Sequence, residues 1–181
     1  MSKSSPEVVY KELLKGKTQT LIMEHELHGV TPEMIDWWWD NLDNDNYKLW
    51  HPKDHIALEW QIPPAKVGHV GAIHMACERI SEVHAQVLRI RWEARESALS
   101  QTIYSHVNVG SALGPGPEDN PLSCVIHEYE VAPYGAKMRS TFTLPVYAPQ
   151  SFLDSLHKHN IEEMGQFPLF LPQLYKDKTG K

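Results

Sequence analysis

Apolar and polar residues alternate along much of the chain from about residue 55 onward, which is the pattern of half-buried β-strands. In the first such segment, Ile56, Leu58 and Trp60 are the apolar positions, and we expect His55 to face the opposite side of the strand. A hairpin is expected around Pro133-Tyr134-Gly135. The predicted strands cover residues 55–60, 72–78 and 87–92, and about 101–108, 122–132 and 137–144.

A helix is predicted at 31–42, before the alternating region. Thr31 is a suitable N-cap and Pro32 suits the first turn, where its missing N–H costs nothing. Glu33 favours the positive end of the helix dipole. The polar run 41–46 is expected to end this helix.

Two more helices are predicted, one near the N-terminus at 7–15 and a long one at about 150–166 that begins near Ser151. The Gly- and Pro-rich stretch 110–121 is expected to be a loop inside one domain. Helices, then a run of antiparallel strands, then one long helix is the order of an α+β fold. A curved sheet wrapped around the last helix would enclose a cavity.

Composition narrows the possible functions. The chain has 181 residues, 41% of them hydrophobic, so one domain of residues 1–181 can bury an adequate core. With 17 Lys and Arg against 23 Asp and Glu, the net charge of −6 argues against binding to nucleic acid or to a membrane surface. The N-terminus has no apolar signal core, and two cysteines show no metal or redox spacing, so we expect a cytoplasmic protein.

Eleven histidines invite a search for a site. In the last helix, Phe152, Leu156, His159, Glu163 and Phe167 follow one another at spacings of four, three, four and four, which places them on one face. A buried ionised carboxylate there needs compensation. A hydrogen-bonded Glu-His pair at a partly open edge, or a bound cation with further ligands, would each provide it.

Further candidates for such ligands occur upstream. His51 and His55 lie in an aromatic segment, and His51 precedes a proline that favours an extended backbone. Alternation also places His74 with Glu78 on one face of a strand, and His127 with Tyr129 on one face of another. Taken singly, each is more often a surface residue of a one-sided sheet.

The chain contains a series of motifs in this order: Trp37-Trp38-Trp39, Tyr47-Lys-Leu-Trp-His-Pro-Lys-Asp-His55, Arg139-Ser-Thr-Phe142, His159-Asn-Ile-Glu-Glu163-Met164 and Phe170-Leu-Pro-Gln-Leu-Tyr175. Their order resembles the family of 2,4-diacetylphloroglucinol hydrolase and phloretin hydrolase. The resemblance covers about residues 30–175 and leaves 1–25 as an N-terminal extension. It implies a helix-grip, Bet v 1-like fold and a zinc-dependent hydrolase that cleaves a carbon–carbon bond between an aromatic ring and an acyl group.

The resemblance implies a His, Glu, His, Glu set of metal ligands. His159 and Glu163 match the helix pair directly. The first histidine is matched by His55, with His51 as the alternative. The first glutamate is matched by Glu78, with Glu82 as the alternative.

The resemblance also implies other roles. His127 corresponds to an active-site histidine that is not a ligand, and Tyr47 to a tyrosine that binds a substrate oxygen. A second tyrosine of the family has no clear match: Phe142 stands near its place, and Tyr129 or Tyr134 are possible substitutes. Aromatic residues such as Trp38, Trp50 and Trp60 are expected to line the pocket.

The expected reaction is a retro-Claisen type cleavage of a small aromatic or polyketide ketone. Water activated by the metal attacks the acyl carbonyl, Tyr47 stabilises the oxyanion, and His127 protonates the departing ring as a general acid. The competing interpretations are a metal-assisted lyase, isomerase or cyclase, and a non-catalytic small-molecule binding protein. A homodimer is favoured because tryptophans near the first helix, if exposed, would be covered by a partner.

Overall fold

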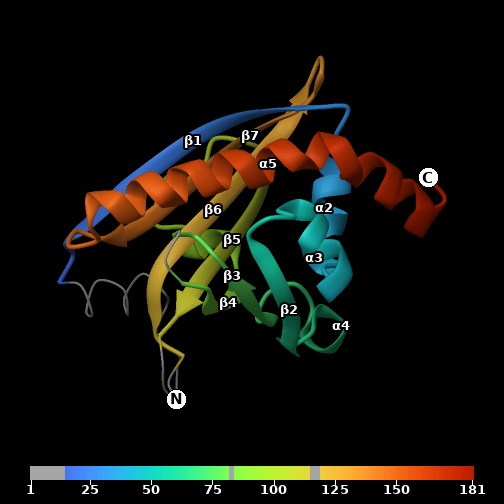
Figure 1. Cartoon of the computed structure of the whole chain (residues 1–181). Coiled ribbons are helices and arrows are strands. Elements are labelled where there is room, and N and C mark those ends of the chain that lie inside the picture. The colour runs from blue at the N-terminus through green and yellow to red at the C-terminus, as the bar shows by residue number, and fades with distance from the viewer. Residues whose placement is uncertain (1–14, 82–83, 115–118) are drawn as a thin grey trace.

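The computed structural model describes residues 15–81, 84–114 and 119–181 (Figure 1). Within them, seven strands form one antiparallel sheet in the order β1-β7-β6-β5-β4-β3-β2, which curves around α5. The strands are β1 (Thr18–His28), β2 (His55–Ile62), β3 (Ile73–Glu78), β4 (Gln86–Glu93), β5 (His106–Leu113), β6 (Pro121–Ala132) and β7 (Gly135–Pro145).

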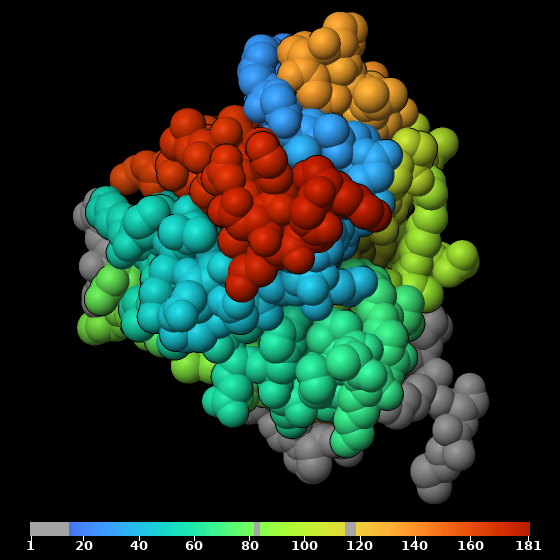
Figure 2. Space-filling view, turned by 90° about the vertical axis from the view of Figure 1, so that its right-hand side faces the viewer, coloured from blue at the N-terminus to red at the C-terminus, as the bar shows by residue number. Residues whose placement is uncertain are grey.

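The helices lie on the concave side of this sheet and at its end. The short elements are α2 (Pro32–Asp40), α3 (Asn44–Trp50), α4 (Pro64–Val67) and the 3₁₀ turn η1 (Arg95–Ser97), and α5 (Gln150–Thr179) crosses the concave face. α5 contacts β1, α2 and α3. Figure 2 shows the C-terminal part of α5, in red, lying against the blue to cyan surface of α2 and α3. This arrangement is the helix-grip fold that the sequence predicts.

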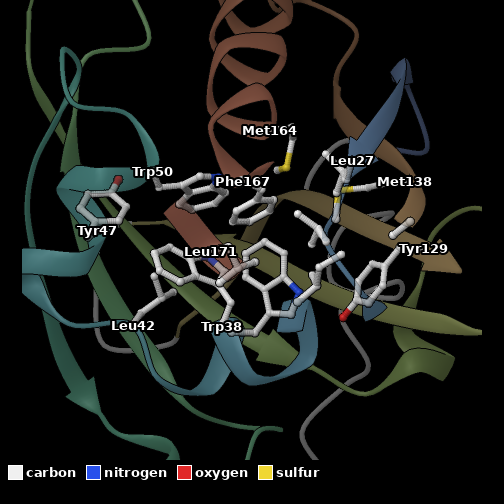
Figure 3. Close-up of a cluster of buried hydrophobic side chains, with 14 of the residues drawn as sticks. Leu27, Trp38, Leu42, Tyr47, Trp50, Tyr129, Met138, Met164, Phe167 and Leu171 are labelled. Atoms are coloured by element: carbon white, nitrogen blue, oxygen red, sulfur yellow. The ribbon is translucent and has the colours of Figure 1, made fainter. Parts of the chain in front are cut away.

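An aromatic core joins α5 to the short helices. Trp38 of α2 makes edge contacts with Trp50 and Phe167, and Phe167 stacks on Trp50 at 5.6 Å (Figure 3). Trp38 and Trp39 are 0% and 2% exposed. Both are therefore core residues, whereas Trp37 on the same helix is half-buried.

Most predicted elements agree with the structure within a few residues. The Thr31 side chain accepts a hydrogen bond from the Met34 N–H, as an N-cap does. α5 is much longer than predicted and continues through Pro168 and Pro172 to Thr179, and no side chain caps its start, so Ser151 is not its cap. The helix expected at 7–15 lies almost entirely outside the described residues.

Three segments differ from the predictions. Residues 18–28 are strand β1, paired along their whole length with β7, and so belong to the sheet rather than to an extension of residues 1–25. The polar run after α2 contains a second helix, α3, because the Asp43 side chain caps it by accepting from the Asp45 and Asn46 N–H groups. The strand predicted at 101–108 is β5, at 106–113, so the loop is shorter than 110–121.

Candidate active site

Four ionisable side chains converge between the sheet and α5. His55 begins β2, Glu78 ends β3, and the two are direct partners across these strands. His55 Nε2 lies 3.4 Å from Glu78 Oε2 and 3.3 Å from His159 Nε2 on α5. Glu163 Oε2 lies 3.6 Å from His55 Nε2 and 3.8 Å from His159 Nε2, and Glu78 Oε2 is 3.9 Å from His159 Nε2. We call these four residues the donor cluster.

A backbone hydrogen bond fixes which nitrogen of His55 faces the cluster. The Nδ1–H of His55 donates to the carbonyl oxygen of Tyr47 at 3.0 Å, which leaves the lone pair of Nε2 pointing at the other three side chains. The ring also stacks on the Tyr47 ring, with centroids 4.0 Å apart and an interplanar angle of 3°. A ring held in this way is ready to bind a cation without reorientation.

A β-bulge gives His55 its direction. The ladder pairs His55 with Glu78 but Ala57 with Cys77, so Ile56 is an extra residue in β2. Simple alternation predicts that His55 faces away from Leu58 and Trp60. The extra residue corrects this prediction and places all three side chains on the concave face, because their partners Glu78, Ala76 and His74 all line the cavity.

The two ligand candidates on α5 lie one turn apart and point the same way. Asn160, between them, donates from Nδ2 to Glu163 Oε1 at 2.8 Å. This bond occupies one carboxylate oxygen of Glu163 and leaves Oε2 facing the histidines. The hydroxyl of Tyr47 donates to Glu78 Oε2 at 2.5 Å, which is the oxygen of Glu78 that faces the histidines.

His51 lies behind the cluster rather than in it. Its ring stacks on that of His159, with centroids 4.6 Å apart and nearly parallel planes. Its Nδ1 accepts from the Asp54 N–H and its Nε2 lies 3.3 Å from Glu162 Oε2. Asp54 Oδ2 is 3.9 Å from His159 Nδ1, which has no hydrogen-bond partner among the described residues. Ligand atoms of His51, Asp54 and His159 lie within 4.8 Å of one another, so these three residues form a second group that could hold a metal ion, next to the donor cluster.

The donor cluster is buried and short of positive charge. His55, Glu78, His159 and Glu163 are 3%, 8%, 4% and 6% exposed. Burial raises the pKa of the Glu78 and Glu163 carboxyl groups. It lowers the pKa of His159, and it lowers that of His55 to about 4. Two neutral imidazoles beside two carboxyl groups leave the carboxylates without a counter-charge. A bound cation would supply it.

The geometry fits a tetrahedral metal ion. Two ligand atoms that are each about 2.0–2.1 Å from a tetrahedral zinc ion lie about 3.3–3.4 Å apart. The five separations between donor atoms of the cluster span 3.3 to 3.9 Å, so a small inward movement closes them on one ion. Imidazole nitrogen and carboxylate oxygen are also the donor types that zinc accepts, and ligand atoms of His55, His159 and Glu163 all lie within 4.8 Å of one another.

A cavity of about 170 Å³ opens beside the donor cluster. Glu78, His159, Glu163 and Tyr47 form its polar end, and the other walls are mainly aromatic and aliphatic. An apolar cavity of about 150 Å³ is enough to hold a benzene molecule. The cavity therefore has room for one aromatic ring next to the cluster.

A second, more polar cavity of about 710 Å³ adjoins the first. The two share Ile80, Phe152 and His159 in their walls. Lys53, Arg79 and Lys158 are exposed around the second cavity. It is thus the open approach to the donor cluster from the side of Phe152.

The structure brings some of the predicted pocket residues to the cavity and not others. Tyr47, Trp50 and His127 line it, as does Phe142. Trp38 does not, because its side chain is enclosed by the aromatic core. Tyr129 is 1% exposed, and its hydroxyl donates to Asp36 on α2 at 2.6 Å. Figure 3 shows Tyr129 on the far side of this core from Tyr47, so it is a structural residue here.

Tyr134 and Trp60 also lie apart from the donor cluster and its cavity. Tyr134 is in the β6–β7 turn, where its ring stacks on His28 at 4.8 Å. Trp60 packs against the edge of His74 at 5.3 Å and is not in the cavity wall. Glu82, the second candidate for the first glutamate, lies outside the described residues.

His127 faces the cavity from β6. Its ring stacks on Trp39 at 5.2 Å and meets the edge of Phe142, and its Nδ1 lies 2.9 Å from Ser140 Oγ. Burial lowers the pKa of His127 to about 3, so the ring is uncharged at neutral pH.

Comparison with known proteins identifies the family. A sequence profile described as the DAPG hydrolase PhiG domain matches residues 2–146. The chain belongs to the DAPG hydrolase PhiG domain family. The matched part contains Tyr47, His55, Glu78 and His127, whereas His159 and Glu163 lie beyond it on α5. No curated protein matches the chain significantly.

Solved structures similar to this member of the DAPG hydrolase family share its fold at low sequence identity. Ara h 8.0201 has a TM-score of 0.60 and 12% identity, over 86% of this chain and 99% of that one. Protein NE0264 from Nitrosomonas europaea has a TM-score of 0.56 and 13% identity, over 90% and 97%. Major latex-like protein 151 from Panax ginseng has a TM-score of 0.55 and 11% identity, over 83% and 97%.

Among the described residues, no helix has the length and apolarity needed to cross a membrane.

Three polar residues around the site were not predicted from the sequence. His25 is on β1, where Met23, His25 and Leu27 alternate with exposed residues, so a period-two signal was present. Asn160 was detectable as the residue three before Glu163 on the same helix face. Ser140 carried no such signal, because a buried serine in a strand is common.

Proposed function

We propose that this member of the DAPG hydrolase family is a zinc-dependent hydrolase that cleaves the carbon–carbon bond between an acyl group and a phenolic ring. The observation that carries the proposal is the donor cluster at the polar end of a cavity sized for one aromatic ring. A hydrolase of this kind needs activated water and a place for the aromatic leaving group, side by side.

Zinc held by His55, Glu78, His159 and Glu163 would polarise a carbonyl and lower the pKa of water. The protein contributes the position of the substrate. An aromatic ring in the cavity lies between the donor cluster and His127, with apolar side chains such as Trp50 and Phe142 against its faces. Its acyl carbonyl then lies at the end occupied by Tyr47, whose hydroxyl can leave Glu78 and donate to the oxyanion.

The substrate class follows from the size of the cavity. A volume of about 170 Å³ admits a single aromatic ring, and the adjoining cavity of about 710 Å³ leaves space for its substituents, so we propose a monocyclic acylphenol. Phenolic hydroxyls beside the acyl carbon also stabilise the negative charge that the ring carries when the bond breaks. His127, which also lines the cavity, is the side chain proposed to assist that departure.

Metal analysis and a hydrolysis assay test this proposal. Protein purified without chelators should contain about one zinc per chain and convert an acylphloroglucinol to the free phenol and the carboxylic acid. His159→Ala and Glu163→Ala should lose metal and activity together. His127→Ala should keep its metal and lose about 10²–10³-fold in turnover, as expected when one polar contact to the transition state is removed.

His157→Ala is the matched control, because His157 is exposed on the same helix, two residues before His159. It should keep both metal and turnover. Metal-free protein from a chelator-free preparation would contradict the metal centre. Fully loaded protein that leaves monocyclic acylphenols intact would contradict the reaction.

A further inference from the structure

A continuous line of buried polar side chains connects the donor cluster to His127. All its members are less than a tenth exposed, and they come from β1, β6, β7 and α5. Apart from the spacing of Asn160 and Glu163 on one helix, the sequence gives no reason to associate them. In order, they are Glu163, Asn160, His25, Ser140 and His127.

The direction of the hydrogen bonds can be read from the Glu163 end. A ligand carboxylate only accepts, so the amide Nδ2 of Asn160 donates to it, at 2.8 Å. The amide oxygen of Asn160 then faces His25 Nε2, at 3.0 Å, and it too can only accept. His25 must therefore carry a proton on Nε2.

That proton decides the direction of the next bond. Ser140 Oγ lies 3.2 Å from His25 Nε2, and because this nitrogen is protonated, Ser140 cannot donate to it. The hydroxyl proton of Ser140 is left for His127 Nδ1, at 2.9 Å. A nitrogen that accepts is unprotonated, so the proton of neutral His127 is on Nε2. His127 Nε2 has no protein partner among the described residues, and the ring lines the cavity.

We infer that His127 acts on the substrate as a neutral hydrogen-bond donor through Nε2–H, and that Ser140 and His25 are positioning residues that hold it in this tautomer. The inference rests on the proposed function for the identity of the site. It replaces the general-acid role expected from sequence. The donor contacts a phenolic oxygen of the ring, where charge accumulates as the carbon–carbon bond breaks, and His127 keeps its proton throughout.

Two features of the surroundings support a neutral ring. His127 lies between the face of Trp39 and the edge of Phe142, and burial depresses its pKa. His25 is similarly buried, and its pKa is lowered to about 4, so it too has a single ring proton to place. The proton that the ring carbon takes up then comes from the water consumed in hydrolysis, which balances the reaction without an imidazolium.

The ring-nitrogen NMR signals of His127 test the inference directly. In zinc-loaded, ¹⁵N-labelled protein, long-range ¹H–¹⁵N spectra distinguish protonated from unprotonated imidazole nitrogens, and a His127→Gln variant assigns the signals. We expect an unprotonated Nδ1 and a protonated Nε2 at pH 7. A proton on Nδ1, or an imidazolium, would overturn the inference whether or not the protein hydrolyses acylphenols.

Ser140→Ala tests the positioning role. Loss of its hydroxyl should let both tautomers of His127 appear in the spectra and lower turnover by at least about tenfold, with metal content unchanged. Ser111→Ala is the matched control, since Ser111 is also 0% exposed in the sheet but its hydroxyl has no partner among the described residues. It should preserve the single tautomer. A single Nε2–H tautomer in the Ser140 variant would show that Ser140 does not position His127.

Discussion

At the residue scale, the proposed metal site depends on atoms that face away from the metal. The Tyr47 carbonyl takes the Nδ1–H of His55, and Asn160 takes one oxygen of Glu163, so each side chain has a single atom left for the ion. These partners are backbone and amide groups that do not titrate. The donor atoms of His55 and Glu163 are therefore oriented by groups that stay the same over the whole pH range in which the fold is stable.

The comparison of His55 with His51 is the sharpest test at this scale. His55→Ala removes a donor atom and should weaken zinc binding by well over tenfold. His51→Ala removes a ring that only stacks behind His159, so its effect should stay below about tenfold, at the lower limit of the range for residues that support metal ligands. Competitive zinc titration against a chromophoric chelator measures both. A larger loss in the His51 variant would move the centre toward Asp54.

At the element scale, α2 is tied to the rest of the protein by two histidine–carboxylate pairs. His69, before β3, bonds Asp40 through Nδ1 at 2.6 Å, and His106 on β5 bonds Asp36 at 2.9 Å. Burial acts to lower the pKa of His69, but the hydrogen bond and the charge of Asp40 outweigh it and the pKa is raised. The pair therefore stabilises the attachment of α2 most when His69 is charged.

This predicts a pH-dependent contribution to stability. A histidine whose pKa is higher in the folded state contributes fully below its unfolded pKa of about 6.5, and the contribution is lost as pH rises through the folded value. Asp40→Asn should therefore lower the free energy of unfolding more at pH 6 than at pH 9. The loss at pH 6 should not exceed about 1 kcal/mol, because the His69–Asp40 pair is partly exposed to solvent. Urea unfolding at the two pH values measures the difference.

Asp154→Asn is the control for that measurement. Asp154 is an exposed carboxylate whose hydrogen-bond partner is the neutral amide of Gln150, so its replacement should have the same small effect at both pH values. An Asp40 variant with equal destabilisation at pH 6 and pH 9 would contradict the role of a charged His69.

Much of the element order could be predicted from local patterns. Alternation located β2, β3, β4, β6 and β7, and the Thr31 cap located α2. α3 was missed because the polar run before it was interpreted only as an end, although Asp43 starts a helix. β1 was missed because the exposed Ile22 and the buried His25 interrupt its apolar–polar alternation, and its partner β7 is more than a hundred residues away.

The donor cluster, too, was predictable only where local geometry determines the positions of its residues. His159 and Glu163 are four residues apart on one helix, so their shared direction follows from helix geometry. The pairing of His55 with Glu78 depends on the register between strands, and the separation of Tyr129 from the cavity depends on its bond to Asp36. Such contacts between distant elements leave no periodic trace in the sequence.

At the scale of the whole molecule, the donor cluster joins parts that otherwise have few contacts. α5 packs on β1, at one edge of the sheet, whereas β2 and β3 form the opposite edge. A metal ion bound by His55, Glu78, His159 and Glu163 would connect that far edge to the helix. Because the unfolded chain lacks this geometry, the binding free energy adds to stability.

Thermal unfolding should therefore respond to zinc. With free zinc at about a hundred times the dissociation constant, the gain is about 2.7 kcal/mol, or an increase in Tm of about 5–10 °C for a chain of this size. Calorimetry with and without chelator measures it. The His159→Ala variant should melt at one temperature in both conditions, and equal Tm values for the wild-type protein would contradict a metal that bridges sheet and helix.

The bulge in β2 has a consequence for the comparison of related chains. Because Ile56 is the extra residue, a chain with a one-residue deletion there would pair His55, Leu58 and Trp60 with the same partners in a regular ladder. In a relative that lacks this residue, the histidine that corresponds to His55 would therefore still lie on the concave face. Relatives should accordingly be recognised by which strand residues pair with each other, and not by the number of residues between the first histidine and the first glutamate.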